Sequence, residues 1–152
     1  MSERDEAALA ALFLEAQNLV YPEVLAELRA GRKRTHWMWF VFPQLAGLGH
    51  SDMARRYALA SVAEARSYFS HAVLAARLVE CTEAVLLHAP DSASPRSLNE
   101  IFGSPDDLKF HSSMTLFHRA APEAGVFGRA LEAFFAGSGD DGTLNLLRRL
   151  PH

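Results

Sequence analysis

A cluster of ionisable and hydroxyl side chains lies between positions 105 and 117, in the segment PDDLKFHSSMTLF. It contains Asp107, Lys109, Ser112 and Ser113. Steps of three and four residues place the lysine and the two serines on adjoining faces of one helix. Such a face could bind an anion or position a hydroxyl group for proton transfer. The structural alternative is that the serines bond to carbonyl groups of their own helix and the aspartate stabilises its N-terminus.

The run from Arg32 to Gly49 joins three consecutive cations to both tryptophans of the chain. Large aromatic side chains beside polar groups are typical either of a core or of a pocket wall. The three cations at the start of this run could hold an anionic group or form a solvated turn. We expect Trp39 to lie in the core with the neighbouring phenylalanines. The residues expected at the edge of a cavity are His36, Trp37 and Gln44.

A third polar group, Tyr57 and Glu64, lies near the middle of the chain. Glu64 follows Ser61 by three residues, the spacing of a capping box at the start of a helix. A lone carboxylate beside aromatic rings would also suit general acid or base catalysis, with a raised pKa. If a pocket exists, we expect Gln44, Tyr57, Glu64 and Lys109 to converge on it.

The sequence predicts no metal site and no cofactor. Seven histidines are present, but no two have the HxxxH or HExxH spacing, and one cysteine cannot supply the usual zinc motifs. The glycines at 47 and 49 lack the GxxxxGK pattern of a phosphate-binding loop. Cys81 lies in an apolar-periodic stretch, so we expect a small buried hydrophobic residue there and not a nucleophile.

Apolar residues recur at helical spacing through most of the chain, and no alternating strand pattern is present. The only internal loop of any length is the segment APDSASP at 89–95. We therefore predict an all-α fold, a compact orthogonal bundle of about eight helices in one domain over residues 1–152. Long helices are expected over 5–20, 72–88, 105–119 and from Pro122 to Phe135. Shorter helices are expected after the capping residues Thr35, Ser51, Ser61, Ser97 and Asp140.

The composition is that of an ordinary globular protein. Hydrophobic residues make up 49% and charged residues 22%, which excludes a disordered chain. No apolar run reaches about 18 residues, the length that indicates a membrane span, and the acidic N-terminus lacks a signal pattern. The formal net charge of -3 gives no overall attraction to nucleic acid. We therefore expect a cytoplasmic protein without membrane binding or specific nucleic-acid binding.

Several long blocks of the sequence resemble a known family. The blocks HWMWFVFPQLAGLG, YALASVAEARSYFSH with VLAARL, IFGSPDDLKFHSSMTLF and FFAGSGDDGTL are similar, in this order, to the hallmarks of domain of unknown function 1810. The resemblance covers residues from about Glu15 to Leu147 and implies a mainly helical fold. Some members carry a calpastatin-like label, but nothing here resembles a repetitive, disordered protease inhibitor. The family supplies no activity that can be carried over to particular residues.

A looser analogy, based on helical class, size and scattered residues, links the chain to NADAR domains, which have N-glycosidase activity on nucleotide-like or ADP-ribosyl substrates. It implies a domain that binds a small anionic, nucleotide-like or ADP-ribose-like ligand, with N-glycoside hydrolysis as its reaction. The catalytic candidates are Glu64, Asp107 and Lys109. The ligand-binding candidates are Lys33, Arg34, His36, Trp37, Gln44, Tyr57, Ser112 and Ser113. The alternative is a non-catalytic module whose DDLKFHSS face meets a protein partner.

Overall fold

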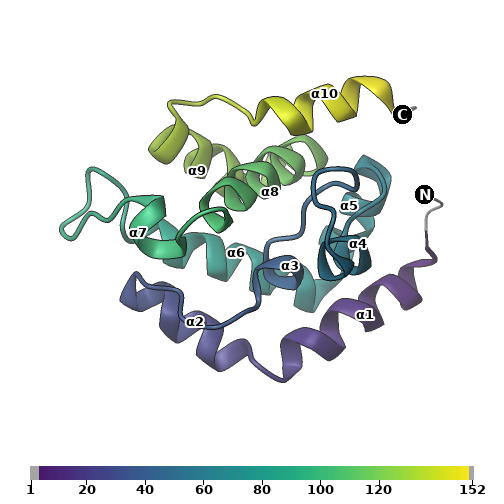
Figure 1. Cartoon of the computed structure of the whole chain (residues 1–152), viewed down its shortest axis with the longest axis horizontal. Coiled ribbons are helices and arrows are strands. Elements are labelled where there is room, and N and C mark those ends of the chain that lie inside the picture. The colour runs from purple at the N-terminus through teal and green to yellow at the C-terminus, as the bar shows by residue number, and fades with distance from the viewer. Residues whose placement is uncertain (1–3, 151–152) are drawn as a thin grey trace.

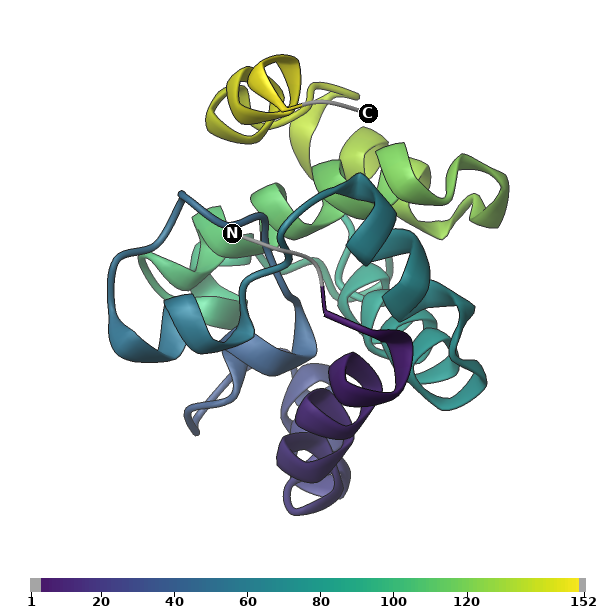
Figure 2. The same cartoon turned by 90° about the vertical axis from the view of Figure 1, so that its right-hand side faces the viewer.

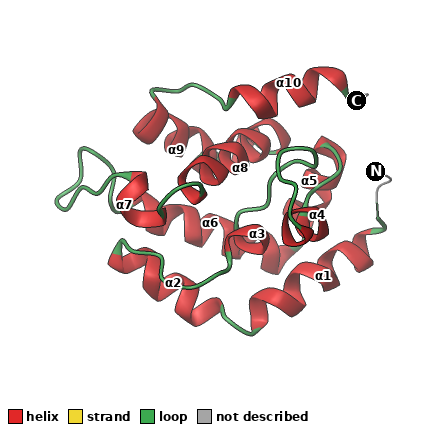
Figure 3. Cartoon of the chain, viewed as in Figure 1, coloured by secondary structure: helices red, strands yellow, loops and turns green. Residues whose placement is uncertain are grey.

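The computed structural model describes residues 4–150, which form ten α-helices, one 3-10 helix and no strand (Figure 1, Figure 3). The all-α prediction is confirmed. The described residues form two more α-helices than the eight expected, and the shortest, α3, α4 and α7, have four to six residues each. The elements are α1 (Glu6–Asn18), α2 (Tyr21–Ala30), α3 (Met38–Val41), α4 (Asp52–Tyr57), α5 (Val62–Ser70), α6 (Ala72–Leu86), α7 (Leu98–Phe102), α8 (Asp106–Ala120), η1 (Pro122–Ala124), α9 (Val126–Phe135) and α10 (Asp141–Arg149).

Several helices begin at the capping residues that the sequence predicts. The side chains of Ser51, Ser61 and Asp140 each accept a hydrogen bond from the backbone N–H three residues later. At α7 both halves of the capping box form, because Ser97 Oγ accepts from Glu100 N–H and Glu100 Oε1 accepts from Ser97 N–H. These caps satisfy N–H groups that the first turn of a helix leaves unpaired.

Two helix starts differ from the prediction. Thr35 caps no helix; its N–H and its hydroxyl group both donate to Glu27, and α3 begins later, after the uncapped Trp37. Pro122 begins only the short η1, and α9 starts after Gly125, whose backbone is left-handed with φ 75°. In both places the chain turns where the apolar periodicity alone would continue a helix.

Helix α8 runs through the centre of the molecule and packs against α5, α7, α9 and α10 (Figure 1, Figure 2). α1 and α2 follow one another along the side away from α10. A chain of fully buried aromatic rings ties these helices together. Ring centroids are 5.0 Å apart between Phe13 and Tyr68, 5.4 Å between Tyr68 and Phe117, and 5.7 Å between Phe117 and Phe127. Such pairs add to the stability that burial alone provides.

Cys81 lies on the inner side of α6 and is fully buried. Burial disfavours the charged thiolate and raises the pKa of the thiol to about 12. The expectation of a small buried residue at this position is confirmed, and the thiol is not activated as a nucleophile.

The segment that precedes α4 pairs with the segment that follows it. Leu59 N–H donates to the carbonyl oxygen of Gln44 at 3.0 Å, and Ala46 N–H donates to that of Leu59 at 2.8 Å. Gly49 makes the close approach possible, since a Cβ atom there would lie 2.6 Å from the Cβ atom of Ala54. The result is that Gln44 is fixed beside α4.

Candidate functional site

A small cavity lies where α3, α4 and α8 meet. Its volume is about 10 Å³, enough for roughly one water molecule or one oxygen atom of a ligand. One wall is apolar, and the rest carries groups that can donate hydrogen bonds. The lining residues are Met38, Trp39, Phe42, Gln44, Ala54, Tyr57, Ala58 and Lys109.

One polar group at this cavity is buried and has no hydrogen-bond partner among residues 4–150. The indole N–H of Trp39 is buried and unpaired. The side chains of Gln44 and Tyr57, which carry further polar groups, also border the cavity. A buried donor without an acceptor costs about 1–3 kcal/mol, so this arrangement favours an occupant that brings an oxygen acceptor.

Lys109 adds a positive charge to the cavity. Its Nζ atom lies 5.2 Å from the centre of the Trp39 ring and 3.4 Å from Asp106 Oδ1. The second oxygen of Asp106 contacts Lys33 Nζ at 2.9 Å, and that ammonium group lies 5.2 Å from the Trp37 ring. Two lysines therefore share one carboxylate, and each also lies over an indole ring.

Glu27 on α2 fixes the segment that carries Lys33. Its carboxylate accepts from Arg34 N–H at 2.7 Å, from the N–H and hydroxyl groups of Thr35, and from Trp37 Nε1 at 3.0 Å. Burial opposes ionisation of Glu27, but these hydrogen bonds, led by that from Arg34, outweigh it and lower its pKa. An ionised carboxylate thus anchors the basic segment beside α3.

The structure brings some of the predicted site residues together. Gln44, Tyr57 and Lys109 line one cavity, and Lys33 joins them through Asp106. Arg34 and His36 are exposed. The two tryptophans occupy the opposite of the places expected for them: Trp37 is 1% exposed, whereas Trp39 is half-buried and borders the cavity.

Glu64 does not line this cavity. It is 2% exposed and forms an ion pair with Arg4, whose Nη2 atom lies 2.6 Å from Glu64 Oε1. The backbone N–H groups of Arg4 and Ala60 donate to it as well, at 3.0 and 2.8 Å. Burial works to raise the pKa of Glu64, but the hydrogen bonds, first that of the Arg4 side chain, lower it overall. Its pKa is therefore shifted away from the range that suits a general acid at neutral pH.

The remaining predicted residues on α8 serve mainly the helix packing. Asp107 accepts from Leu108 N–H and from Asn99 Nδ2 at 3.4 Å. Ser112 donates to the carbonyl oxygen of Leu108 and to Asp140. Ser113 is fully buried, and its hydroxyl group has no partner within the described part of the chain. None of the three lines the cavity.

Sequence reasoning missed two members of the site. Asp106 was not among the predicted site residues, although its i,i+3 spacing to Lys109 is a signal for an ion pair. Trp39 was assigned to the core, and its distinction from Trp37 rests on contacts with α2 and α8 that are distant in the sequence.

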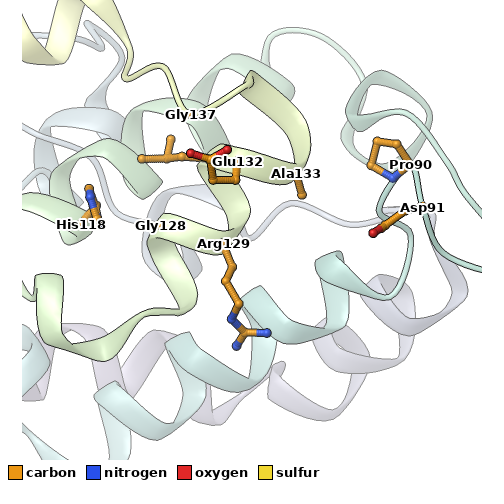
Figure 4. A pocket seen from close by; sticks show the side chains of 9 residues that line it. Pro90, Asp91, His118, Gly128, Arg129, Glu132, Ala133 and Gly137 are labelled. Atoms are coloured by element: carbon orange, nitrogen blue, oxygen red, sulfur yellow. The ribbon is translucent and has the colours of Figure 1, made fainter.

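A larger groove, of about 710 Å³, crosses α9 near the end of α6 (Figure 4). Figure 4 shows that Arg129 and Glu132 leave α9 in different directions. Arg129 pairs with the exposed Glu83 at 3.2 Å, while His118 and Asp91 lie toward opposite ends of the groove. No lining side chain carries a buried unpaired polar atom. The smaller cavity at Lys109 is therefore the better candidate site.

Two features of other protein classes are absent from residues 4–150. No group of three or more histidine, cysteine, aspartate or glutamate side chains gathers in a way that could hold a metal ion. None of the helices in this range combines the length and apolar character needed to cross a bilayer.

Comparison with known proteins gives a family and a structural relative. A family model described as "Protein of unknown function (DUF1810)" matches residues 8–147. The chain is also similar to the conserved hypothetical protein Rv1873 from Mycobacterium tuberculosis, whose crystal structure is known. The two are 51% identical with a TM-score of 0.83, over 90% of this chain and 94% of that chain. No curated protein matches. Because the family model spans most of the sequence, the chain belongs to the DUF1810 family.

Proposed function

We propose that this domain binds a small organic anion, whose oxygen atom enters the cavity between α3, α4 and α8. The observation that carries the proposal is the buried, unpaired Trp39 N–H in a cavity that Lys109 and Gln44 also line. An anionic oxygen would satisfy these donors, and hydrogen bonds to charged groups are about twice as strong as neutral ones.

The size of the cavity limits what can enter it. Sites that enclose a whole small molecule usually measure about 300–1,000 Å³, whereas this cavity has room for a single oxygen atom. The ligand would therefore insert only its charged end, and the rest would lie against the surface. The nucleotide-like or ADP-ribose-like ligand considered above is one member of this class.

Binding is proposed here without N-glycoside hydrolysis. A general acid or base must lie within hydrogen-bond reach of the reacting group. Of the carboxylates considered for that role, Glu64 is held by Arg4, and Asp107 is bonded to Asn99 and to its own helix. Neither is among the residues that line the cavity.

The test is a thermal-shift and calorimetric screen at constant ionic strength, with acetate, benzoate, phosphate, AMP, ADP-ribose and NAD. A ligand at a hundred times its Kd stabilises the folded state by about 2.7 kcal/mol, which raises Tm by roughly 5–10 °C. Lys109→Met and Gln44→Leu should each reduce that shift. Arg119→Met, which removes an exposed cation from the same helix, is the matched control and should leave it intact.

The proposal fails if none of these anions raises Tm, or if Lys109→Met responds to them as the unmodified protein does. A cavity that holds only water would give that result. The function to test next would then be the non-catalytic module that binds a protein partner.

A further inference from the structure

We infer that Asp106 is an internal counterion of Lys109, and that Lys109 leaves it when the ligand binds. Because Asp106 stays in place, the site selects a ligand group with one negative charge, such as a carboxylate. This inference rests on the proposed function and assigns a specificity-determining role to a residue outside the cavity lining. Its basis is the unequal way in which the two lysines share Asp106.

The contact with Lys33 is the tighter of the two. Lys33 Nζ lies 2.9 Å from Asp106 Oδ2, and the lysine side chain is only 7% exposed. Lys109 Nζ lies 3.4 Å from Asp106 Oδ1, and its side chain is 23% exposed. The second contact is longer and more accessible to water, so it is the easier one to exchange for a ligand oxygen.

Lys33 is also held in place by its surroundings. Its backbone N–H donates to the Ile101 carbonyl oxygen at 2.6 Å, and its ammonium group lies over the Trp37 ring. The next residues of the segment are anchored by Glu27. Lys33 can therefore keep Asp106 in position while Lys109 turns to the ligand. In this arrangement Lys33 is a positioning residue and does not itself contact the ligand.

The charge of the cluster indicates the class of ligand. Two ammonium groups and one carboxylate leave one net positive charge in a half-buried place. A monoanion would neutralise it, whereas a dianion such as a phosphate monoester would leave an excess negative charge beside Asp106. Uncompensated charge is costly where the surroundings exclude water. The neighbouring Asp107 is engaged with Asn99 and Leu108.

The experiment compares benzoate with phenylphosphonate, which share a phenyl group, at a pH where the phosphonate carries two charges. Calorimetry on the unmodified chain should show tighter binding of benzoate. In Asp106→Asn the cluster gains a positive charge, so phenylphosphonate should gain at least about tenfold more affinity than benzoate does. Asp107→Asn removes the adjacent charge and should leave the ratio of the two affinities unchanged.

Lys33→Met tests the positioning role. Without Lys33, Asp106 has only Lys109 as a partner and should hold it away from the ligand, so benzoate binding should weaken by about tenfold. The double variant Lys33→Met with Asp106→Asn frees Lys109 again and should restore benzoate binding. Thermal unfolding of each variant without ligand shows whether it is folded. The recovery in the double variant could not arise from a merely structural loss.

The inference is overturned if Asp106→Asn changes both affinities by the same factor or weakens both, or if Lys33→Met leaves benzoate binding unchanged. These outcomes differ from failure of the proposed function, in which benzoate does not bind at all or binds equally well to Lys109→Met. The proposed function is therefore tested by Lys109→Met, and the role of Asp106 by Asp106→Asn and Lys33→Met.

Discussion

The buried Glu64 and the partly buried Glu27 illustrate how neighbours decide what an acidic side chain can do. Each accepts several hydrogen bonds from N–H groups, and each has a lowered pKa although burial opposes its ionisation. An acid of this kind remains ionised at neutral pH and contributes electrostatic anchoring. A buried glutamate with fewer N–H donors around it would have a raised pKa, which is what catalysis by Glu64 would require.

The anchoring by Glu64 should make stability depend on pH. Because its folded pKa lies below the ordinary value of 4.5, its contribution is present above about pH 4.5 and is lost as pH falls through the folded pKa. We expect Glu64→Gln to lower the free energy of unfolding at pH 7 by about 1–3 kcal/mol, and the difference from the unmodified protein to shrink at pH 3. Urea unfolding at both pH values measures it.

Glu123→Gln is the control for this measurement, because Glu123 is exposed on η1 and its replacement should change stability little at either pH. A loss of stability in Glu64→Gln that persists undiminished at pH 3 would mean that shape, and not ionisation, makes Glu64 important.

Among the helices, α10 shows how a single residue can attach an element to the core. Asp140 Oδ2 accepts from the N–H and hydroxyl groups of Thr143 and from the hydroxyl group of Ser112 on α8. The backbone N–H of Asp140 donates to Thr115 Oγ1 at 2.9 Å. The residue therefore caps α10 and joins it to α8 at the same time. This explains why Ser112, a predicted ligand-binding residue, is occupied elsewhere.

Removing this cap should loosen α10 more than it loosens the rest of the fold. We expect Asp140→Ala to cost about 1–2 kcal/mol and to speed amide hydrogen exchange within Asp141–Arg149. Asp141→Ala, one residue along and exposed, should have a much smaller effect. Equal acceleration of exchange in α10 and in α8 would show instead that the two helices open as one unit.

Across the molecule, a feature could be predicted from the sequence when the residues that determine it lie close together in the chain. The capping box of Ser97 and Glu100 lies within one turn and forms as predicted. The all-helical class rests on periodicity summed over the chain, so it survives errors at individual helix ends. The break at Gly125 was missed because the apolar pattern continues across it.

The site was only partly predictable because its decisive contacts join residues far apart in the sequence. Glu64 meets Arg4 across 60 residues, and the indole N–H of Trp37 donates to Glu27 on α2. No local pattern distinguishes Trp37 from Trp39, which differ only in what the fold places next to them. Of the four residues expected to converge on one cavity, Gln44, Tyr57 and Lys109 do so, and Glu64 does not.

Because Cys81 is buried, the rate at which a thiol reagent labels it can report how often the fold opens. With the single thiol fully buried and its pKa raised to about 12, a thiol reagent can reach it only when the fold opens. The rate of labelling then reports how often the native state opens. A bound anion should slow that rate by the factor 1 + [L]/Kd, since it binds only the folded chain. Titration of benzoate against labelling rate would thus measure occupancy of the Lys109 cavity through the native sulfur atom on α6, without an engineered labelling site.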